Sequence, residues 1–298
     1  MILVVGATGL LGGFICHRLR QLGHPVRGLV RPTADANKLA ALQQSGTELA
    51  FGDLKDAASL AAACQGVAAV ITTASSTLSR QPGDSIETVD RRSYLSLIEA
   101  AKTAGVSRFV YTSIAASFRY ESPLTRAKSE VEARLVESGL GYTVLAANFF
   151  MEVWLSPALG FDYLNARARI YGNGDKPIGW VSFKDVAEFA VRSLETERAR
   201  NRKLLVGGPE LLSPRDVVRI FEEVSGRPFA LETVPEEALE TQRRSATDPL
   251  SETFAALMLD YAAGCAMSME ETLRVIPLHL TSVREYARAV SAARSAVA

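Results

Sequence analysis

The chain is poor in cysteine and histidine, the residues that most often form cross-links or hold soft metals, with three of each in 298 residues. The cysteines are Cys16, Cys64 and Cys265, and the histidines are His17, His24 and His279. The cysteines are odd in number, scattered and without a Cys-x-x-Cys pair, so the sequence predicts neither a disulfide framework nor a thiolate metal site. The histidines lack the spacing of metal ligands, and we expect no metal in this protein.

An excess of charge of either sign is also absent. Lys plus Arg and Asp plus Glu each number 33, which gives a formal net charge of zero. A neutral chain has no overall field that attracts nucleic acid or an anionic membrane, so we expect a small-molecule partner. No apolar run reaches the roughly 18 residues of a membrane span, and the apolar start has no cationic lead, so we expect a cytoplasmic protein.

Two catalytic motifs are missing as well. The chain has no Gly-x-Ser-x-Gly turn, which exposes the nucleophile of many hydrolases, and no phosphate-binding loop with its lysine. Hydrolase and kinase functions are therefore disfavoured. The composition, 48% hydrophobic over 298 residues, is otherwise that of a protein with a large core.

The chain does contain a regular alternation of short apolar strands with helices. Strands are expected at residues 1–5, 25–30, 47–51, 67–72, 109–112, 142–147 and 203–206. Apolar residues at helical spacing lie between them. Because the strands are apolar on both faces, the pattern predicts an α/β fold with a doubly wound parallel sheet of the Rossmann type, covered by helices on both sides.

The character of the sequence changes along the chain. Residues 1–155 are expected to form the nucleotide-binding core, which residues 177–207 complete. The stretch from Glu152 to Asp175 contains several glycines and a proline, so we predict irregular loops that face the substrate. Residues 156–176 and 208–298 are expected to form a smaller, mainly helical substrate-binding portion.

Two of the later helices have marked starts. Ser182 with Asp185 has the spacing of a capping box, in which two side chains bond reciprocally to the backbone of the first turn. Ser213 is expected to be an N-cap, with the acidic Asp216 at the third helical position. Pro214 occupies the first helical position after Ser213, where its fixed φ favours a helix. Both sites predict the first residue of a helix.

The first strand runs directly into Gly6-Ala7-Thr8-Gly9-Leu10-Leu11-Gly12. Gly6 leaves the strand where a Cβ would crowd the backbone, Gly9 lets the main chain approach a pyrophosphate, and Gly12 lets the next helix pack on the strand. That helix points its positive N-terminal end at the phosphates. The residues expected to bind a dinucleotide are Gly6, Thr8, Gly9, Leu10, Leu11 and Gly12. The alternative is an ordinary loop between a strand and a helix.

The end of the second strand indicates which dinucleotide binds. NAD-binding folds place an acidic residue there, which accepts hydrogen bonds from the adenosine ribose. This chain has Arg31, and no acidic residue follows before Asp35. A guanidinium pairs well with a 2′-phosphate, so NADP is favoured over NAD. The alternative is that Arg31 is a solvated loop residue.

Two further strand ends are expected along the cofactor crevice. Asp53 and Leu54 follow the third strand, where the carboxylate either accepts from the adenine amino group or caps the next helix. The fourth strand ends in small side chains that leave room for ribose and phosphates. These residues are Thr73, Ala74 and Ser75.

Several segments together carry a resemblance to a known family. Besides the glycine turn they are Val30-Arg31, Gly52-Asp53-Leu54, Gly105-Val106-Ser107-Arg108-Phe109-Val110-Tyr111-Thr112-Ser113, Lys128-Ser129-Glu130-Val131-Glu132, Phe149-Phe150-Met151-Glu152, Val181-Ser182-Phe183-Lys184-Asp185-Val186-Ala187 and Gly207-Gly208-Pro209-Glu210. The chain resembles atypical short-chain dehydrogenases/reductases of the NmrA-like group, which includes isoflavone-reductase-like, triphenylmethane-reductase-like and quinone-reductase-like proteins. The resemblance covers nearly the whole chain and implies a Rossmann fold that binds NADP(H).

The catalytic signature of ordinary short-chain dehydrogenases is incomplete. In Tyr-x-x-x-Lys the lysine lowers the pKa of the tyrosine and holds the nicotinamide ribose. Lys128 has Leu124 four residues earlier, and Tyr120 lies off the required spacing. The resemblance still implies ribose binding or acid/base work for Lys128, and Ser113 lies near the superfamily's catalytic Ser or Thr. The alternative is a solvated Lys128 paired with Glu132.

A second departure lies before the Phe-Phe-Met-Glu stretch. Relatives more often have Arg-Pro where this chain has Ala146-Ala147, which puts in doubt any contact made by that arginine. The resemblance places Asn148 and Phe149 near the nicotinamide, as an amide partner and an apolar wall. Four more residues either line a substrate pocket or pack in the core. They are Phe150, Met151, Trp154 and Phe161.

The sequence therefore predicts an NADPH-dependent reductase that passes a hydride to a small conjugated or aromatic acceptor such as a quinone or an enone. Such acceptors take hydride at carbon and then a proton from water or Lys128, so they tolerate a missing tyrosine. One alternative is a non-catalytic NADP(H)-binding sensor or regulator, which Leu124 fits equally well. Another is a nucleotide-sugar epimerase, which also needs the missing tyrosine. We expect a monomer or a homodimer.

Overall fold

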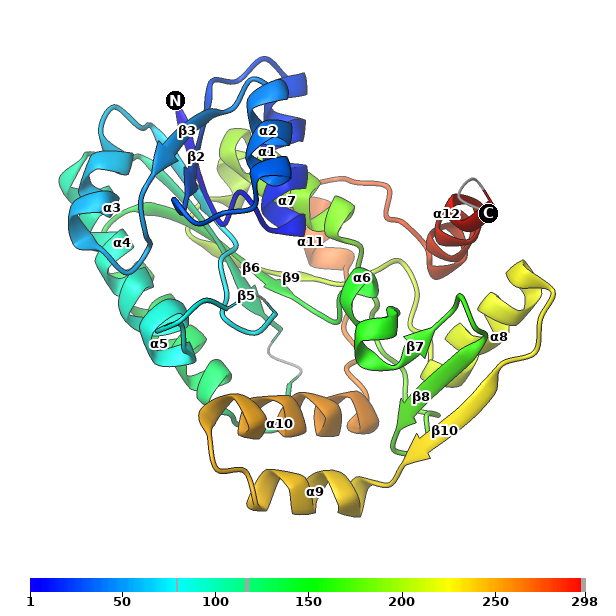
Figure 1. Cartoon of the computed structure of the whole chain (residues 1–298). Coiled ribbons are helices and arrows are strands. Elements are labelled where there is room, and N and C mark those ends of the chain that lie inside the picture. Colours follow the sequence, from blue (N-terminus) through cyan, green and yellow to red (C-terminus); the bar gives the residue numbers. More distant parts are fainter. Residues whose placement is uncertain (79, 116–117, 296–298) are drawn as a thin grey trace.

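The apolar strands expected from the sequence lie side by side in one sheet (Figure 1). The computed structural model describes residues 1–78, 80–115 and 118–295. Its larger sheet has the strand order β3-β2-β1-β4-β5-β6-β9, with every neighbouring pair parallel. The strands are β1 (Ile2–Val5), β2 (Val26–Val30), β3 (Glu48–Phe51), β4 (Ala69–Thr72), β5 (Arg108–Ile114), β6 (Gly141–Ala147) and β9 (Arg202–Val206). The predicted doubly wound sheet is confirmed.

The strand order reverses beside β1. The chain runs outward from β1 through β2 to β3, then returns to the centre and continues through β4, β5 and β6 on the other side. In open parallel sheets, ligands bind outside the carboxyl ends of the strands at such a reversal. The predicted cofactor turn, which leaves the end of β1, therefore lies at the crevice between β1 and β4.

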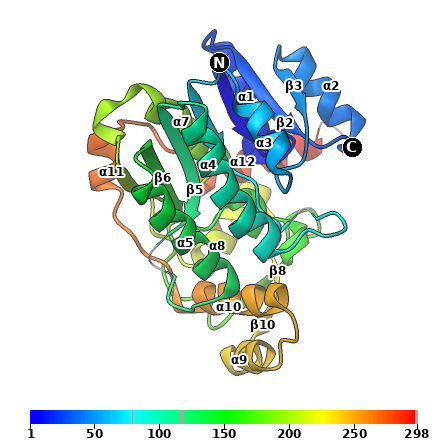
Figure 2. The same ribbon diagram turned by 90° about the vertical axis from the view of Figure 1, so that its left-hand side faces the viewer.

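Helices cover both faces of this sheet (Figures 1 and 2). One layer consists of α1 (Leu10–Gln21), α2 (Ala36–Gln44), α7 (Phe183–Glu195) and α11 (Glu270–Val275), and the other of α3 (Ala57–Cys64), α4 (Ser93–Thr103) and α5 (Pro123–Glu137). Successive side chains of a strand point to opposite faces. Val4 accordingly packs in the core beneath the first layer, and Leu3 and Val5 pack in the core beneath the second.

The rest of the chain builds a second, smaller sheet with helices around it. Its strand order is β10-β8-β7, with β8 parallel to β10 and antiparallel to β7. The elements of this part are α6 (Met151–Trp154), β7 (Phe161–Asp162), β8 (Arg167–Tyr171), α8 (Pro214–Ser225), β10 (Ala230–Val234), α9 (Glu236–Arg244), α10 (Pro249–Ala263) and α12 (Val283–Ser295). A short 3-10 turn in this part spans Pro157–Leu159, and another, Glu197–Ala199, lies between α7 and β9 of the larger sheet. A separate apolar cluster, which includes Phe161, Ile170 and Phe221, forms the core of the smaller part.

This sheet corrects one expectation, because the stretch predicted to be irregular contains β8. The C-terminal portion is mainly helical, as predicted, and also contributes the strand β10, which pairs with β8 through Ala168 and Leu231. The partners are distant in sequence, so no local pattern announces the pairing. The predicted boundaries of the smaller portion, 156–176 and 208–298, remain a prediction, and residues 296–298 lie outside the described residues.

The predicted helix starts are found, with one correction. Ser213 and Asp216 form the reciprocal box at the start of α8. Ser182 caps α7, but Asp185 does not complete a box with it. The Asp185 carboxylate instead accepts hydrogen bonds from the backbone N–H and the hydroxyl of Thr281, and so ties α7 to the chain before α12.

A short π-helix, Ile86–Arg92, precedes α4 and was not predicted. Its wider turn carries Asp90, which is completely buried. Isolated π-helical turns are frequent at functional sites because they reorient one side chain within a helix. Over residues 1–78, 80–115 and 118–295, no helix is both long and apolar enough to cross a bilayer.

Candidate functional site

The turn after β1 has no room for side chains at two of its glycines. Gly6 has a φ of +88°, and a Cβ there would lie 2.8 Å from the Thr73 hydroxyl oxygen and 2.9 Å from the Ala74 nitrogen. A Cβ at Gly12 would lie 2.1 Å from the Gly6 carbonyl oxygen. The first turn of α1 therefore sits directly against the end of β1, with its free N–H groups at the crevice. This geometry fits a dinucleotide pyrophosphate.

A cavity of about 490 Å³ runs along the carboxyl ends of the central strands. The predicted site residues that line it are Gly6, Thr8, Gly9, Leu10, Leu11, Arg31, Asp53, Leu54, Thr73, Ala74, Ser75, Ser113, Lys128, Asn148 and Phe149. Gly12 does not line the cavity, because it lies behind the turn and allows α1 to approach Gly6. The structure thus brings the predicted cofactor residues and the predicted catalytic residues into one site.

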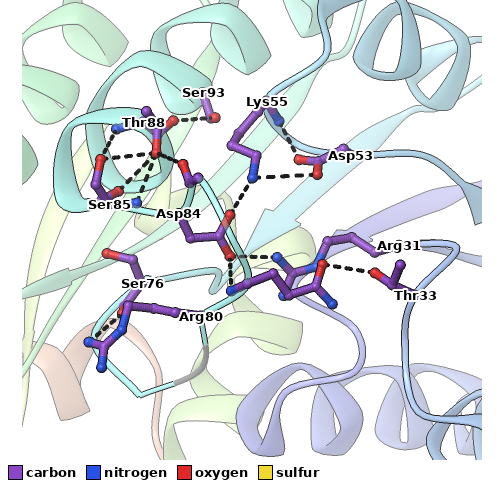
Figure 3. Close-up of polar contacts among 12 residues, drawn as sticks. Arg31, Thr33, Asp53, Lys55, Ser76, Arg80, Asp84, Ser85, Thr88 and Ser93 are labelled. Atoms are coloured by element: carbon purple, nitrogen blue, oxygen red, sulfur yellow. Dashed lines mark hydrogen bonds and ion pairs between the residues drawn. The ribbon is translucent and has the colours of Figure 1, made fainter.

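Arg31 lies at one end of this cavity, immediately after β2 (Figure 3). Its Nη1 donates to Asp84 Oδ2 at 2.6 Å. Its Nε and Nη2 have no protein acceptor within the described chain. Nε and Nη2 of this guanidinium, whose side chain is 28% exposed, can thus donate to an anion, as the predicted 2′-phosphate contact requires.

Asp84 forms ion pairs with both Arg31 and Lys55. Neither Asp84 nor Lys55 was predicted from the sequence to be a site residue. Lys55 donates through Nζ to Asp84 Oδ1, and Asp84 comes from the chain between β4 and the π-helix. A lysine directly after the Gly52-Asp53-Leu54 segment is a signal that could have indicated Lys55. Nothing local marks Asp84, because its partners come from two distant strand ends.

Asp53 does not cap a helix. Its Oδ1 accepts from the backbone N–H of Lys55 at 2.8 Å, and its other oxygen lies 3.7 Å from Lys55 Nζ. Asp56 caps α3 instead, accepting from the N–H groups of Ala58 and Ser59. The helix-cap alternative for Asp53 is therefore wrong, and its adenine contact remains a prediction.

Lys128 is buried rather than solvated, with 6% of its surface exposed. It lies on α5, and its Nζ donates to the Thr112 carbonyl oxygen at 3.1 Å and lies 5.1 Å from the centre of the Tyr111 ring. Burial lowers the pKa of Lys128, while the charges of Asp90 and Glu132 oppose that shift. The alternative of a solvated lysine paired with Glu132 is wrong.

Glu132 is bonded elsewhere. It accepts from the Ser113 hydroxyl at 2.5 Å and from Lys203 Nζ at 2.6 Å. The Ser113 proton therefore points at α5, so Ser113 presents its oxygen lone pairs, and no free proton, to the rest of the site. In this arrangement Ser113 positions α5 against β5, and its predicted catalytic role remains untested.

No phenolic acid takes the place of the missing tyrosine in the described part of the cavity wall. Leu124 lines the cavity one turn before Lys128. Tyr120 is not part of the wall: it packs against the core of the smaller portion, and Arg243 lies over its ring at 5.6 Å. Its backbone N–H, with that of Arg119, donates to Asp260 on α10.

Asp90 is a second residue that sequence reasoning missed. Its Oδ2 accepts from the backbone N–H of Ser76 at 3.0 Å and from the Ser76 hydroxyl at 2.6 Å. Its Oδ1 has no hydrogen-bond partner among the described residues, and neither does the nearby Tyr111 hydroxyl. A fully buried carboxylate close to a buried lysine supplies the charge that favours the protonated amine.

The other end of the cavity is apolar and aromatic. Asn148 is buried beneath it, with its amide nitrogen donating to the Cys265 carbonyl and its amide oxygen accepting from the Phe149 N–H. Phe150 and Trp154 line the cavity, whereas Met151 and Phe161 lie in the surrounding core. The sequence left both possibilities open for these four residues, and the structure divides them.

The cysteines and the acidic residues form no metal site in the described ranges. Cys16, Cys64 and Cys265 are buried and not disulfide-bonded. No group of three His, Cys, Asp or Glu side chains that could hold a metal ion occurs among residues 1–78, 80–115 and 118–295.

The chain is similar in sequence to proteins of a known family. A sequence profile of the NmrA-like family matches residues 1–287. An NAD(P)H azoreductase from Xenophilus azovorans is 30% identical over 98% of this chain and 99% of its own. A photosystem II assembly factor from Cyanophora paradoxa is 32% identical over 82% of this chain and 74% of its own.

The fold is also found among solved structures. An NADPH-dependent quinone oxidoreductase from Escherichia coli, crystallised with NADPH, superposes with a TM-score of 0.78 over 98% of this chain and all of its own. Its sequence identity to this chain is 22%. At that level the likeness establishes a common fold.

Proposed function

The chain belongs to the NmrA-like family, and on this premise we propose that it is an NADPH-dependent reductase of small conjugated acceptors. NADPH would supply the hydride. The glycine turn would hold its pyrophosphate, Arg31 its 2′-phosphate, and Lys128 its nicotinamide ribose. The observation that carries the proposal is that Arg31, the glycine turn and Lys128 all line one cavity.

The chemistry expected of the acceptor follows from the residues around Lys128. Leu124 offers no proton, so an alkoxide formed by reducing a simple ketone would lack a positioned acid. Lys128 is a buried amine with a lowered pKa, and it can deliver a proton after hydride has reached carbon. Quinones, enones and extended aromatic systems delocalise the negative charge and need only this later protonation.

The apolar end of the cavity supports a flat acceptor. Phe118, Phe149, Phe150, Trp154 and Phe254 all line it. Aromatic walls of this kind bind planar conjugated rings through stacking and through release of water. The relatives named as an azoreductase and a quinone oxidoreductase are consistent with this substrate class.

A second function is favoured by a specific observation. Leu124 occupies the position of the usual catalytic tyrosine, so that proton donor is missing. In addition, one relative that is 32% identical is named as an assembly factor. A protein that binds NADP(H) for regulation or assembly, without turnover, would keep Arg31 and the glycine turn and would not need a proton donor. We propose a monomer or homodimer in either case.

The two functions are separated by following the absorbance of NADPH in the presence of the protein and a panel of quinones, enones and azo dyes. A reductase consumes NADPH with at least one acceptor. Binding of NADPH without consumption in any reaction favours the regulatory function. If the protein binds neither NADPH nor NADH, both proposals fail.

Arg31→Ala tests the cofactor assignment. Loss of charge-assisted hydrogen bonds to a phosphate costs about 1.5–3 kcal/mol, which corresponds to roughly a ten- to hundred-fold weaker Kd for NADPH. The Kd for NADH should change by less than about three-fold. Calorimetric titration with each cofactor measures both, and equal losses would contradict the 2′-phosphate role. Arg27→Ala, on the same strand but in an ion pair with Glu48, is the matched control.

A further inference from the structure

Asp84 is a buried anion in the wall of the cofactor cavity. Its side chain is only 2% exposed. Oδ2 accepts from Arg31 Nη1 at 2.6 Å and from the Gln81 backbone N–H at 2.9 Å, and Oδ1 accepts from Lys55 Nζ. Figure 3 shows the carboxylate between the two cationic side chains, which come from the ends of β2 and β3.

The carboxylate uses donors that an adenosine 2′-phosphate would also use. Carboxylate and phosphate oxygens both accept from guanidinium and ammonium N–H groups, with similar geometry. Arg31 Nη1 and Lys55 Nζ already serve Asp84. When a 2′-phosphate approaches Arg31, the Nη1 of Arg31 is therefore already bonded to Asp84, which is negatively charged like the phosphate.

The positive charges at this end of the cavity are also balanced by nearby carboxylates. Arg31 and Lys55 carry two positive charges, and Asp84 and Asp53, which lies 3.7 Å from Lys55 Nζ, carry two negative charges. Within these contacts the formal charge sums to zero. Lys38 also lines this end of the cavity, but it forms no ion pair with any of the four within the described chain.

Asp84 stays ionised at neutral pH. Burial alone would raise the pKa of Asp84, but the hydrogen bonds from Lys55, the Gln81 N–H and Arg31 outweigh burial and hold that pKa below its ordinary value. The negative charge is therefore present whenever a cofactor arrives, and protonation does not remove it.

We propose that Asp84 determines cofactor specificity by competing with the 2′-phosphate for Arg31 and Lys55. This inference rests on the proposed function, because it concerns the same cofactor site. The 2′-phosphate of NADPH would bind Arg31 and Lys55 beside the like-charged Asp84 carboxylate and share their N–H donors with it, whereas NADH has no 2′-phosphate and leaves the ion pairs intact. In addition, the Asp84 carboxylate provides this site with the kind of acidic group that accepts from ribose hydroxyls in NAD-binding folds. Arg31 favours NADPH over NADH, and Asp84 thus makes the difference in affinity between the two cofactors smaller.

The test compares Asp84→Asn with the wild type, using adenosine 2′,5′-bisphosphate and 5′-AMP as probes that differ only in the 2′-phosphate. The variant removes the charge and keeps an oxygen that can accept from Gln81. The Kd for the bisphosphate should fall at least about five-fold, by removal of a like charge, while the Kd for 5′-AMP should not fall. The ratio of the NADH and NADPH Kd values should rise by a similar factor.

Asp56→Asn is the matched control. It removes the same charge one residue after Lys55, at an exposed helix cap that contacts neither Arg31 nor Lys55. Asparagine caps helices as well as aspartate does, so both Kd values should remain within about two-fold of the wild type. An equal gain in this control would indicate general charge instead of competition, and it would overturn the proposal.

The remaining outcomes are decisive in different ways. A wild type that binds the bisphosphate, with a variant whose affinity is unchanged or weaker, overturns the inference and leaves the proposed function standing; Asp84 would then merely orient the cations. A wild type that binds neither probe overturns both. If Asp84→Asn does not fold, Asp84→Ser makes the same comparison with a smaller neutral acceptor.

Discussion

At the scale of single residues, the most unusual group is the buried ammonium of Lys128. Its only direct acceptor among the described residues is the Thr112 carbonyl. Burial lowers its pKa, and the carboxylates of Asp90 and Glu132 counter the effect. Of these two, Asp90 is fully buried, and in the described part of the chain its carboxylate accepts only from Ser76, so the charge of Asp90 is the less screened. In the proposed reaction, Asp90 would therefore act through Lys128.

Asp90→Asn should move the pH profile of turnover. The substitution removes the negative charge that favours protonated Lys128, so the pKa of Lys128 falls further and the alkaline limb of the kcat profile moves to lower pH. Asparagine can still accept from Ser76, so the local structure is kept. The measurement is kcat against pH, with the KM for NADPH followed at each point.

Glu130→Gln is the control for this shift. Glu130 lies on α5, the helix that carries Lys128, but it is paired with Arg91 at the surface. Removing the charge of Glu130 should leave the pH profile of kcat unchanged. A profile that is unchanged in Asp90→Asn, with kcat reduced uniformly, would show that Asp90 serves only the fold.

At the scale of elements, the contact between β1 and α1 depends on one glycine. Gly12 and Gly13 are neighbours in the same helical turn. A Cβ at Gly12 would lie 2.1 Å from the Gly6 carbonyl oxygen and 2.7 Å from its carbonyl carbon, whereas a Cβ at Gly13 would have no close contact below 3.8 Å. Only the first substitution forces two backbone segments apart.

Gly12→Ala should therefore destabilise the protein by about 1–3 kcal/mol, the usual cost of overpacking. Gly13→Ala should be neutral or stabilising by up to about 1 kcal/mol, because alanine favours the helix. Urea unfolding measures both, and NADPH titration of the folded variants shows whether the turn still binds. Equal stability of the two variants would contradict the close packing of α1 on Gly6.

The elements also show what a sequence can and cannot predict. The seven strands of the large sheet and the helices between them were predictable because each strand is a short apolar run and each helix has an apolar face. The β8–β10 pairing was not, since Ala168 and Leu231 are partners only through the tertiary fold. The π-helix was not predictable either, because its residues read locally as the start of an ordinary helix.

Some residues of the candidate site could also be predicted from the sequence, and others could not. Arg31 and the glycine turn could be placed on the cavity from their position after strands β1 and β2, because parallel strands end at one edge. Asp84 and Asp90 could not, because Asp84 lies in the loop before the π-helix, Asp90 lies on the π-helix itself, and each acquires its partners only on folding. For Lys128 the residue was predictable and its environment was not, since burial depends on how α5 packs on β5.

At the scale of the whole molecule, Asp260 links the two portions. It lies on α10 and accepts from the backbone N–H groups of Arg119 and Tyr120, which follow β5. Burial raises the pKa of Asp260 to about 6, although those hydrogen bonds oppose the shift. The folded protein then holds this proton more tightly than the unfolded chain, in which an aspartate has a pKa of about 3.9.

This difference fixes the sign of a pH effect on stability. Between about pH 4 and pH 6 the folded state binds more protons, so the contribution of Asp260 to the free energy of unfolding decreases as pH rises, by up to about 3 kcal/mol. Asp260→Asn keeps an oxygen for Arg119 and Tyr120 and removes the titration. Its stability relative to the wild type should therefore rise between pH 4 and pH 7.

Urea unfolding at several pH values across this range measures the difference. Asp175→Asn, which removes a carboxylate from an exposed pair with Arg215, is the control and should not reproduce the trend. A difference between wild type and Asp260→Asn that is constant with pH would contradict the raised pKa.

The route of the chain through its two sheets has a consequence for biosynthesis. The chain leaves the large sheet after β6, forms β7 and β8, returns to add β9 at the edge of the large sheet, and only then supplies β10. A chain emerging from the ribosome can pair the first six strands in order. The strand β8, however, cannot pair with its parallel partner β10 until α8 and then β10 have been synthesised. No single cleavage of the backbone separates the two sheets, so the protein cannot be divided into two independent fragments at any one peptide bond.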